Sequence, residues 1–228
     1  DPGEYDLSST QYGALFLPQV VTAISAALLG ASLGGRFGTK RVYLAGLCAG
    51  LLSMALLLVS ALFAGDTSAY VLLLATASLG AGFGLTVPAL NTLAAAFHRE
   101  RPARAILVLN ALLGFGTVLA PVFVAVFDGL GAWWGLPLTS AILLVALLLV
   151  SARLPLRTEA ARPTPARAGD RMPGRFWAYA GFAVLYGICE TVNGNWAQLD
   201  MTDLGASTAT ASVALTAFWA MVTLGRIL

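Results

Sequence analysis

The chain of 228 residues is 58% hydrophobic and only 11% charged, and its mean hydropathy is +0.82. Soluble domains carry about 25% charged residues, so this composition excludes a water-soluble globular protein and predicts an integral membrane protein. The formal net charge of +2 is small, and we expect no nucleic-acid partner. Both cysteines, Cys48 and Cys189, fall within apolar segments, where free thiols are expected rather than a disulfide framework or a metal site.

Seven apolar segments follow a polar, acidic opening of the chain. They are Tyr12–Leu33, Val42–Ala64, Tyr70–Phe97, Ala105–Phe127, Trp134–Ala152, Phe176–Leu199 and Ala209–Leu224. Most are close to the ~20 residues that span about 30 Å of hydrocarbon. Backbone groups in lipid must be satisfied within the segment, and the alternation typical of a membrane β-barrel is absent. The sequence therefore predicts an all-α integral membrane bundle with seven visible transmembrane helices.

All 13 basic residues of the chain fall on one side of this topology. They are Arg36, Lys40, Arg41, Arg99, Arg101, Arg104, Arg153, Arg157, Arg162, Arg167, Arg171, Arg175 and Arg226. The connections on the other side carry only acidic charges, at Asp66, Asp128, Asp200 and Asp203. Cytoplasmic loops are enriched in Lys and Arg, so the basic side is predicted to be cytoplasmic. We expect a multi-pass protein of the inner or plasma membrane, with one earlier helix preceding the sequence.

The longest connection, residues 153–175, is rich in arginine, alanine and proline. This composition predicts a flexible cytoplasmic linker between two helical groups. Its basic residues either hold anionic lipid headgroups or only fix the topology, and the sequence leaves both alternatives open.

Small residues recur at a spacing of four in the first three segments. They are Ala26, Gly30 and Gly34, then Gly46 and Gly50, then Gly80 and Gly84. Such faces let helices approach closely in lipid, so they predict a tightly packed bundle. The run from Gly80 to Gly84 lies in an apolar span with no preceding strand, which favours helix packing over a dinucleotide-binding turn.

Glu190 is the one acidic or basic residue in the interior of an apolar segment. A carboxylate at membrane depth costs about 2.5–3.5 kcal/mol on insertion scales, so it usually serves function. Tyr186, Glu190 and Asn193 are four and three residues apart and share a helix face, and Trp196 follows three residues later. A carboxylate, an amide and aromatic rings suit a sugar, whose hydroxyls they bond while a ring stacks on its apolar face. The alternative is that Glu190 pairs with a neighbouring helix for purely structural reasons.

Further polar residues extend this candidate site. Asn193, Gly194 and Asn195 are turn-prone and predict a break in the helix, as transporters show at binding sites. Three other amides within spans either line a cavity or form interhelical hydrogen bonds; they are Gln19, Asn91 and Asn110.

Enzyme chemistry has little support in this sequence. The single histidine, His98, lies at a cytoplasmic helix end, and no nucleophile–base pair is evident. We expect no catalytic activity, no metal site and no cofactor.

The predicted cytoplasmic loop from Gly34 to Val42 combines glycines with three cations. The glycines permit a tight turn, and the cations can engage helix C-terminal carbonyls and lipid phosphates. The loop resembles the signature between the second and third helices of the major facilitator superfamily. The basic and glycine positions of that signature are matched by Arg36, Gly38, Lys40 and Arg41. The resemblance implies that these residues, together with Gly34, form a cytoplasmic gating loop. The resemblance has two departures, Gly35 where the family usually has Asp and Ala31 where it has the first Gly.

The resemblance extends over the whole chain. The stretches Gly84–Thr92, Asn110–Gly116 with Pro121, and Glu190–Trp196 look like the fucose-permease-like branch of sugar permeases. The resemblance implies that the visible helices are the second to eighth of the family. Residues 1–152 are then an N-terminal half-bundle lacking its first helix, and residues 176–228 start the C-terminal half-bundle after the linker.

The resemblance implies a secondary transporter that moves a small polar solute, a sugar, by alternating access. Glu190 would bond substrate or take up a proton, while Asn193, Asn195 and Trp196 line the cavity. The family's sugar symporters resemble one another in having acids in the first and fourth helices, whereas the fourth offers only Asn91 here. The expected partners are the solute, a coupling proton, membrane lipids and the remaining helices of the transporter.

Two other functions remain open. The run from Gly116 to Pro121 is similar to the glycine-rich signature of proton antiporters, with Ala120 replacing a glycine, so a drug or metabolite antiporter is the first alternative. A non-transporting membrane receptor or sensor is the second.

Overall fold

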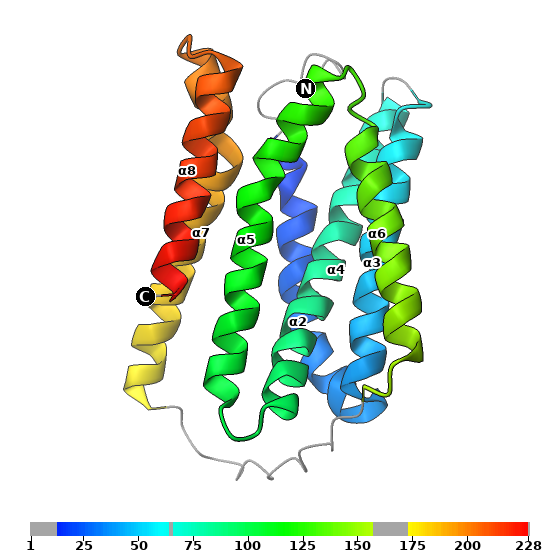
Figure 1. Ribbon diagram of the computed structural model, residues 1–228, viewed down its shortest axis with the longest axis vertical. Coiled ribbons are helices and arrows are strands. Elements are labelled where there is room, and N and C mark those ends of the chain that lie inside the picture. Colours follow the sequence, from blue (N-terminus) through cyan, green and yellow to red (C-terminus); the bar gives the residue numbers. More distant parts are fainter. Residues whose placement is uncertain (1–12, 64–65, 157–172, 228) are drawn as a thin grey trace. The chain divides into compact units, whose positions relative to one another are not determined.

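The computed structural model describes residues 13–63, 66–156 and 173–227. Seven long helices run through these residues, and their order is shown in Figure 1. They are α2 (Phe16–Phe37), α3 (Thr39–Ser60), α4 (Asp66–Phe97), α5 (Pro102–Gly129), α6 (Gly135–Arg153), α7 (Gly174–Asp203) and α8 (Thr208–Ile227). The predicted all-α architecture is confirmed, with one helix for each predicted segment.

Six of these seven helices are long and apolar enough to cross a membrane, and α7 is not among them. At 30 residues α7 has the length to cross, but Glu190 and the asparagines that follow it lower its apolarity. Our expectation that the segment from Phe176 to Leu199 spans the membrane therefore rests on its length and on its place in the topology. The polar residues that make α7 a candidate for function are the same ones that weaken its membrane signal.

The first predicted loop is much shorter than expected. Gly34 and Gly35 lie in the last turn of α2, and the turn to α3 consists of Gly38 alone. Gly38 has a φ of 91°, which residues with a Cβ rarely adopt, and its N–H donates to the carbonyl oxygen of Gly34 at 3.0 Å. The loop was predicted where the apolar residues end and the charged residues begin. The backbone hydrogen bonds of α2 and α3 continue through those charged residues, so the helices are longer than their apolar segments.

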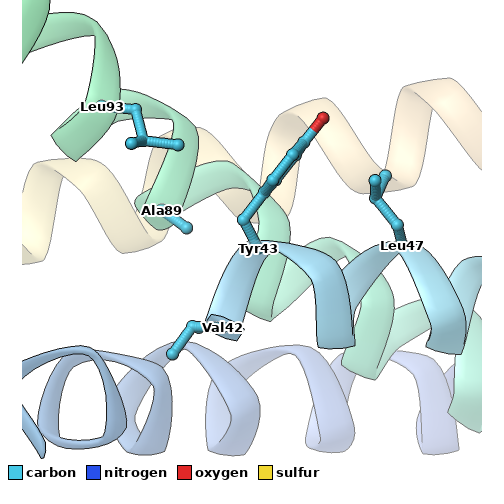
Figure 2. Packing of buried hydrophobic residues seen from close by; sticks show 5 residues of the cluster. All are labelled: Val42, Tyr43, Leu47, Ala89 and Leu93. Atoms are coloured by element: carbon cyan, nitrogen blue, oxygen red, sulfur yellow. The ribbon is translucent and has the colours of Figure 1, made fainter. Parts of the chain in front are cut away.

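One compact unit of the chain contains α2, α3, α4 and α6. Within it α4 packs against both α2 and α3, and α3 also packs against α6. A cluster of buried side chains lies on α3 and α4, as Figure 2 shows. Its members are Val42, Tyr43, Leu47, Ala89 and Leu93, and Leu144, Leu148 and Leu156 pack against it. The Tyr43 hydroxyl lies 3.3 Å from the Ser151 hydroxyl in a buried hydrogen bond to α6.

Glycines set the distances between the helices of this unit. A Cβ on Gly46 of α3 would meet the Thr86 hydroxyl and lie 3.0 Å from the Gly82 carbonyl oxygen on α4. A Cβ on Gly80 or Gly84 of α4 would meet the backbone of α2. The predicted close approach of small-residue faces is thus confirmed at these glycines. Gly34 differs from them, because a Cβ there would have no neighbour within 4 Å among the described residues.

A second compact unit contains α7, α8 and residues 107–131, which include most of α5. In it α7 packs against α8, and Gln198 of α7 donates a side-chain hydrogen bond to the Ser212 hydroxyl at 3.3 Å. Most of α5 therefore belongs with helices that follow the linker. Our assignment of residues 1–152 and 176–228 to two half-bundles stays a prediction, and linker residues 157–172 lie outside the described part.

Candidate functional site

Helix α7 carries four of the predicted site residues with described side chains. Glu190 is half-buried, whereas Tyr186, Asn193 and Trp196 are more exposed, at 41% for Tyr186 and 37% for Trp196. Their spacing of four, three and three residues distributes them along successive turns of the helix. A carboxylate, an amide and two aromatic rings are therefore offered from one continuous element.

The predicted helix break at Asn193, Gly194 and Asn195 is wrong. α7 continues without interruption from Gly174 to Asp203. The Asn193 side-chain amide donates to the carbonyl oxygen of Cys189, four residues earlier, at 2.8 Å, so it bonds within the helix instead of opening a turn. A continuous helix pairs the backbone groups of its interior with one another, as a membrane-spanning segment requires. Asn195 is helical, but its side chain lies outside the described part of the chain.

Gly194 has a packing role that the sequence did not reveal. A Cβ at this position would lie 2.6 Å from Cζ2 of Trp219 on α8. Trp219 therefore lies against α7 at the residue between Asn193 and Asn195, and its ring meets Phe218 edge-on with centroids 5.2 Å apart. Because its aromatic ring lies beside polar residues of α7, Trp219 is a further candidate site residue. Only the pairing of α7 with α8 identifies it, because no local pattern links Trp219 to Gly194.

The remaining predicted site residues lie on three other helices. Gln19 of α2 and Asn91 of α4 are half-buried in the first compact unit. The side-chain oxygen of Asn91 is buried and has no hydrogen-bond partner among the described residues, and buried acceptors of this kind are uncommon. Asn110 is half-buried on α5 and belongs to the second unit, with α7. The structure thus groups Asn110, Tyr186, Glu190, Asn193 and Trp196 in one unit, and Gln19 and Asn91 in the other.

The cytoplasmic cations of α2 and α3 have separate environments. The Lys40 ammonium donates to the carbonyl oxygens of Ala152 and Leu154 at 2.8 and 2.6 Å. Because the last carbonyls of a helix lack N–H partners, this cation completes the end of α6, as expected for cations of this loop. The Arg36 guanidinium lies 5.2 Å from the ring centroid of Phe37, and Arg41 is exposed.

A comparison with protein families gives one decisive match: the model of the Major Facilitator Superfamily matches residues 3–228. The chain belongs to the major facilitator superfamily. Comparisons with curated proteins and with solved structures gave no match.

Family membership gives these observations a setting. The protein is a multi-pass membrane transporter of the major facilitator superfamily, surrounded by lipid and acting on small-molecule substrates. Among the described residues, no group of three histidine, cysteine, aspartate or glutamate side chains could hold a metal ion. Within the predicted gating loop of this transporter, Lys40 has a defined structural partner at the end of α6, whereas the gating role of the loop stays a prediction.

Proposed function

We propose that this protein is a secondary active transporter of the fucose-permease-like branch. It moves a small polar solute, a sugar, across the inner or plasma membrane by alternating access. The half-buried carboxylate of Glu190 on α7 carries this proposal, because a carboxylate at membrane depth is retained at a cost and marks ion or substrate paths.

The side chains around Glu190 support a sugar as the substrate. The Glu190 carboxylate can accept hydrogen bonds from sugar hydroxyl groups, and the Asn193 amide can donate and accept them. Tyr186 and Trp196 offer apolar ring faces on which a pyranose can stack. The ring of Trp219, lying against Gly194, adds a third aromatic surface next to these polar groups. Gln19, Asn91, Asn110 and Asn195 contribute further amides from α2, α4, α5 and α7 in the assembled transporter.

The proposed transporter contains more helices than this sequence. The visible helices correspond to the second to eighth of the family, with the first helix and the last four outside the sequence. Residues 1–152 and 176–228 then belong to two half-bundles that rock about the site, and the basic segment from 153 to 175 joins them. Sequencing the complete gene tests this arrangement, because five further spans without an added soluble domain support a transporter and oppose a receptor or sensor.

Proton coupling through Glu190 is tested by uptake into proteoliposomes as a function of pH. We expect Glu190→Gln in the full-length protein to abolish proton-driven accumulation and to flatten the pH dependence of uptake. Asp200→Asn is the matched control, since it removes an exposed carboxylate ten residues further along the same helix, and it should leave both unchanged. Unaltered pH dependence and exchange in Glu190→Gln would exclude the coupling role.

The substrate class is tested by the thermal stability of the full-length protein in the presence of sugars and of amphipathic cations. A sugar should raise the unfolding temperature, and Trp196→Ala should remove that shift by deleting a stacking surface. Stabilisation by amphipathic cations alone would favour a drug or metabolite antiporter instead. Binding without uptake in proteoliposomes would favour a receptor.

A further inference from the structure

Two exposed arginines flank the place where the start of α3 meets the end of α6. The Lys40 ammonium of α3 donates to the carbonyl oxygens of Ala152 and Leu154, and Figure 1 shows the two helix ends side by side. Arg41 directly follows Lys40 in the sequence, and Arg153 lies between the two acceptor residues. The contact made by Lys40 therefore brings Arg41 and Arg153 to one place on the surface of the first compact unit.

The charges of these arginines are not compensated by the helices that carry them. Lys40 is half-buried and bonded to two carbonyl oxygens, whereas Arg41 and Arg153 are exposed. Neither arginine side chain has a hydrogen bond or an ion pair within the described part of the chain. The described residues of the first unit contain two acidic side chains, Asp66 and Glu100, and neither of these lies on α3 or α6. An anionic group from outside the described residues can thus bind here.

Both arginines lie at the depth of lipid headgroups. Residues 39–60 and 135–153 form helices that are long and apolar enough to cross a membrane. Arg41 is in the first turn of α3, and Arg153 is the last residue of α6. The ends of a span of this length lie where the hydrocarbon meets the phosphate layer. The two guanidinium groups are therefore placed to meet phospholipid headgroups.

Exposed apolar side chains adjoin these cations and favour a lipid over a soluble anion. Val150 and Leu154 of the last part of α6 are 55% and 46% exposed, and they lie four residues apart on one side of the chain's path around Arg153. A phospholipid needs a cationic group for its phosphate and an apolar surface for the first carbons of its acyl chains. The end of α6 offers both.

The use of arginine at these positions also suits a phosphate. The planar guanidinium forms paired hydrogen bonds to phosphate oxygens, whereas an ammonium acts as a point charge. Lysine and arginine serve equally to fix membrane topology, so topology alone does not require arginine at positions 41 and 153. Lys40, the single lysine of the sequence, is the cation that binds backbone carbonyls instead.

We propose that Arg41 and Arg153 hold the phosphate of an anionic phospholipid of the cytoplasmic leaflet, whose acyl chains lie along Val150 and Leu154. A zwitterionic lipid binds less well there, because its own cationic group offsets the charge of its phosphate. The bound lipid joins α3 to α6 beside the contact of Lys40 and stabilises this end of the first unit. The inference rests on the fold and on the membrane setting, and it is independent of the substrate proposed above.

The experiment follows the unfolding temperature of the full-length protein in a neutral detergent during titration with dioctanoyl phosphatidylglycerol. A ligand that binds the folded state raises this temperature as its concentration increases. We expect a saturable rise with phosphatidylglycerol, and no rise with equal concentrations of dioctanoyl phosphatidylcholine or of inorganic phosphate. A rise of the same size with phosphatidylcholine would mean that only the acyl chains bind, and one with inorganic phosphate would assign the arginines to a soluble anion. Either result would overturn the proposal.

Two pairs of substitutions locate the site. Arg41→Gln combined with Arg153→Gln should increase the half-maximal phosphatidylglycerol concentration on the order of 30-fold, since each cation near an anionic lipid surface contributes a factor of about five. Arg101→Gln combined with Arg104→Gln is the matched control. It removes the same charge from exposed positions around the start of α5, and it should change that concentration by less than about threefold.

Equal weakening by the two pairs would show a diffuse attraction of the whole cytoplasmic surface and would overturn a site at α3 and α6. So would an unchanged half-maximal concentration in Arg41→Gln with Arg153→Gln. If that pair does not fold, Arg153→Gln alone should weaken the effect of phosphatidylglycerol by about fivefold, and parent-like behaviour of this single variant would refute the proposal.

Discussion

Lys40, in the first turn of α3, reaches the carbonyl oxygen of Leu154 beyond the end of α6, with the ammonium nitrogen 2.6 Å away. The same ammonium donates to Ala152 at 2.8 Å. The carbonyls at a helix C-terminus lack intrahelical partners and carry partial negative charge, so a cation there satisfies both needs. Leu156, two residues on, packs against the buried cluster of α3 and α4. The first residues of the long linker, directly after α6, are therefore held against α3 by the charge of Lys40 and by the apolar side chain of Leu156.

Removal of this cation should loosen the end of α6. We expect Lys40→Met to lower the free energy of unfolding by about 1 kcal/mol, since a charge at a helix end is worth about 0.3–1 kcal/mol and hydrogen bonds to charged groups somewhat more. Thermal unfolding in detergent should show a decrease of roughly 2–4 °C for a chain of this size. Arg41→Gln is the matched control, because it removes an exposed cation one residue away. Equal losses in both variants would contradict a specific role for Lys40.

Gly46 should tolerate no side chain. A Cβ there would meet the Thr86 hydroxyl and lie 3.0 Å from both the Gly82 carbonyl oxygen and the Thr86 backbone nitrogen on α4. Backbone atoms cannot rotate away, so we expect Gly46→Ala to destabilise the protein by about 1–3 kcal/mol, as overpacking does. Gly34→Ala, where none of the residues that the structure describes lies within 4 Å, should be neutral or stabilising by up to about 1 kcal/mol. Chemical or thermal unfolding measures the stabilities of the two variants. Similar stabilities would refute the packing role of Gly46.

The existence of the helices could be predicted from the sequence, whereas their ends could not. Length and apolarity reveal the part of a helix that lies in hydrocarbon, as between Val42 and Ser60 of α3. They do not reveal where backbone hydrogen bonds stop, so the single-residue turn at Gly38 was missed. Glycine at four-residue spacing predicted close packing, but Gly34 and Gly46 look alike in sequence. Only the presence of α4 against one of them makes that glycine indispensable.

The candidate site also has features that the sequence predicts and features that only the structure reveals. Glu190 was identifiable because a carboxylate in an apolar segment is rare on energetic grounds. The turn expected at Asn193 was wrong because its amide bonds back to Cys189 within the helix. Trp219 could not be found from α8 alone, since its importance depends on which residue of α7 it meets. Contacts between helices distant in sequence are what the linear pattern leaves out.

The contact between Gly194 and Trp219 predicts a coupled effect on packing and binding. Gly194→Ala places a methyl group 2.6 Å from Cζ2 of the indole ring, so the ring has to move. We expect a loss of stability of about 1–3 kcal/mol together with weaker binding of the solute found in the thermal screen. Gly187→Ala on the same helix, which has no neighbour within 4 Å in the described part of the chain, should change neither stability nor binding.

A second substitution separates the two effects of Gly194→Ala. Trp219→Phe shortens the ring and should recover stability in the Gly194→Ala background by relieving the conflict. Binding should not recover, because the smaller ring leaves less surface for stacking. Recovery of binding along with stability would show that Trp219 acts only through helix packing.

Asn91 on α4 provides the clearest separation of stability from function. Its side-chain oxygen is buried without a hydrogen-bond partner among the described residues, and such an acceptor costs about 1–3 kcal/mol. We expect Asn91→Leu, of similar volume, to raise stability by about 1 kcal/mol, since replacing an unsatisfied polar group by an apolar one removes that cost. If Asn91 lines the substrate path as proposed, transport by the same variant should fall by about tenfold or more, because a hydrogen bond to the solute is lost. Thermal unfolding and uptake in proteoliposomes measure the two quantities separately. A more stable protein with undiminished uptake would assign Asn91 to packing, and a less stable one would mean that its amide has a structural partner in the assembled transporter.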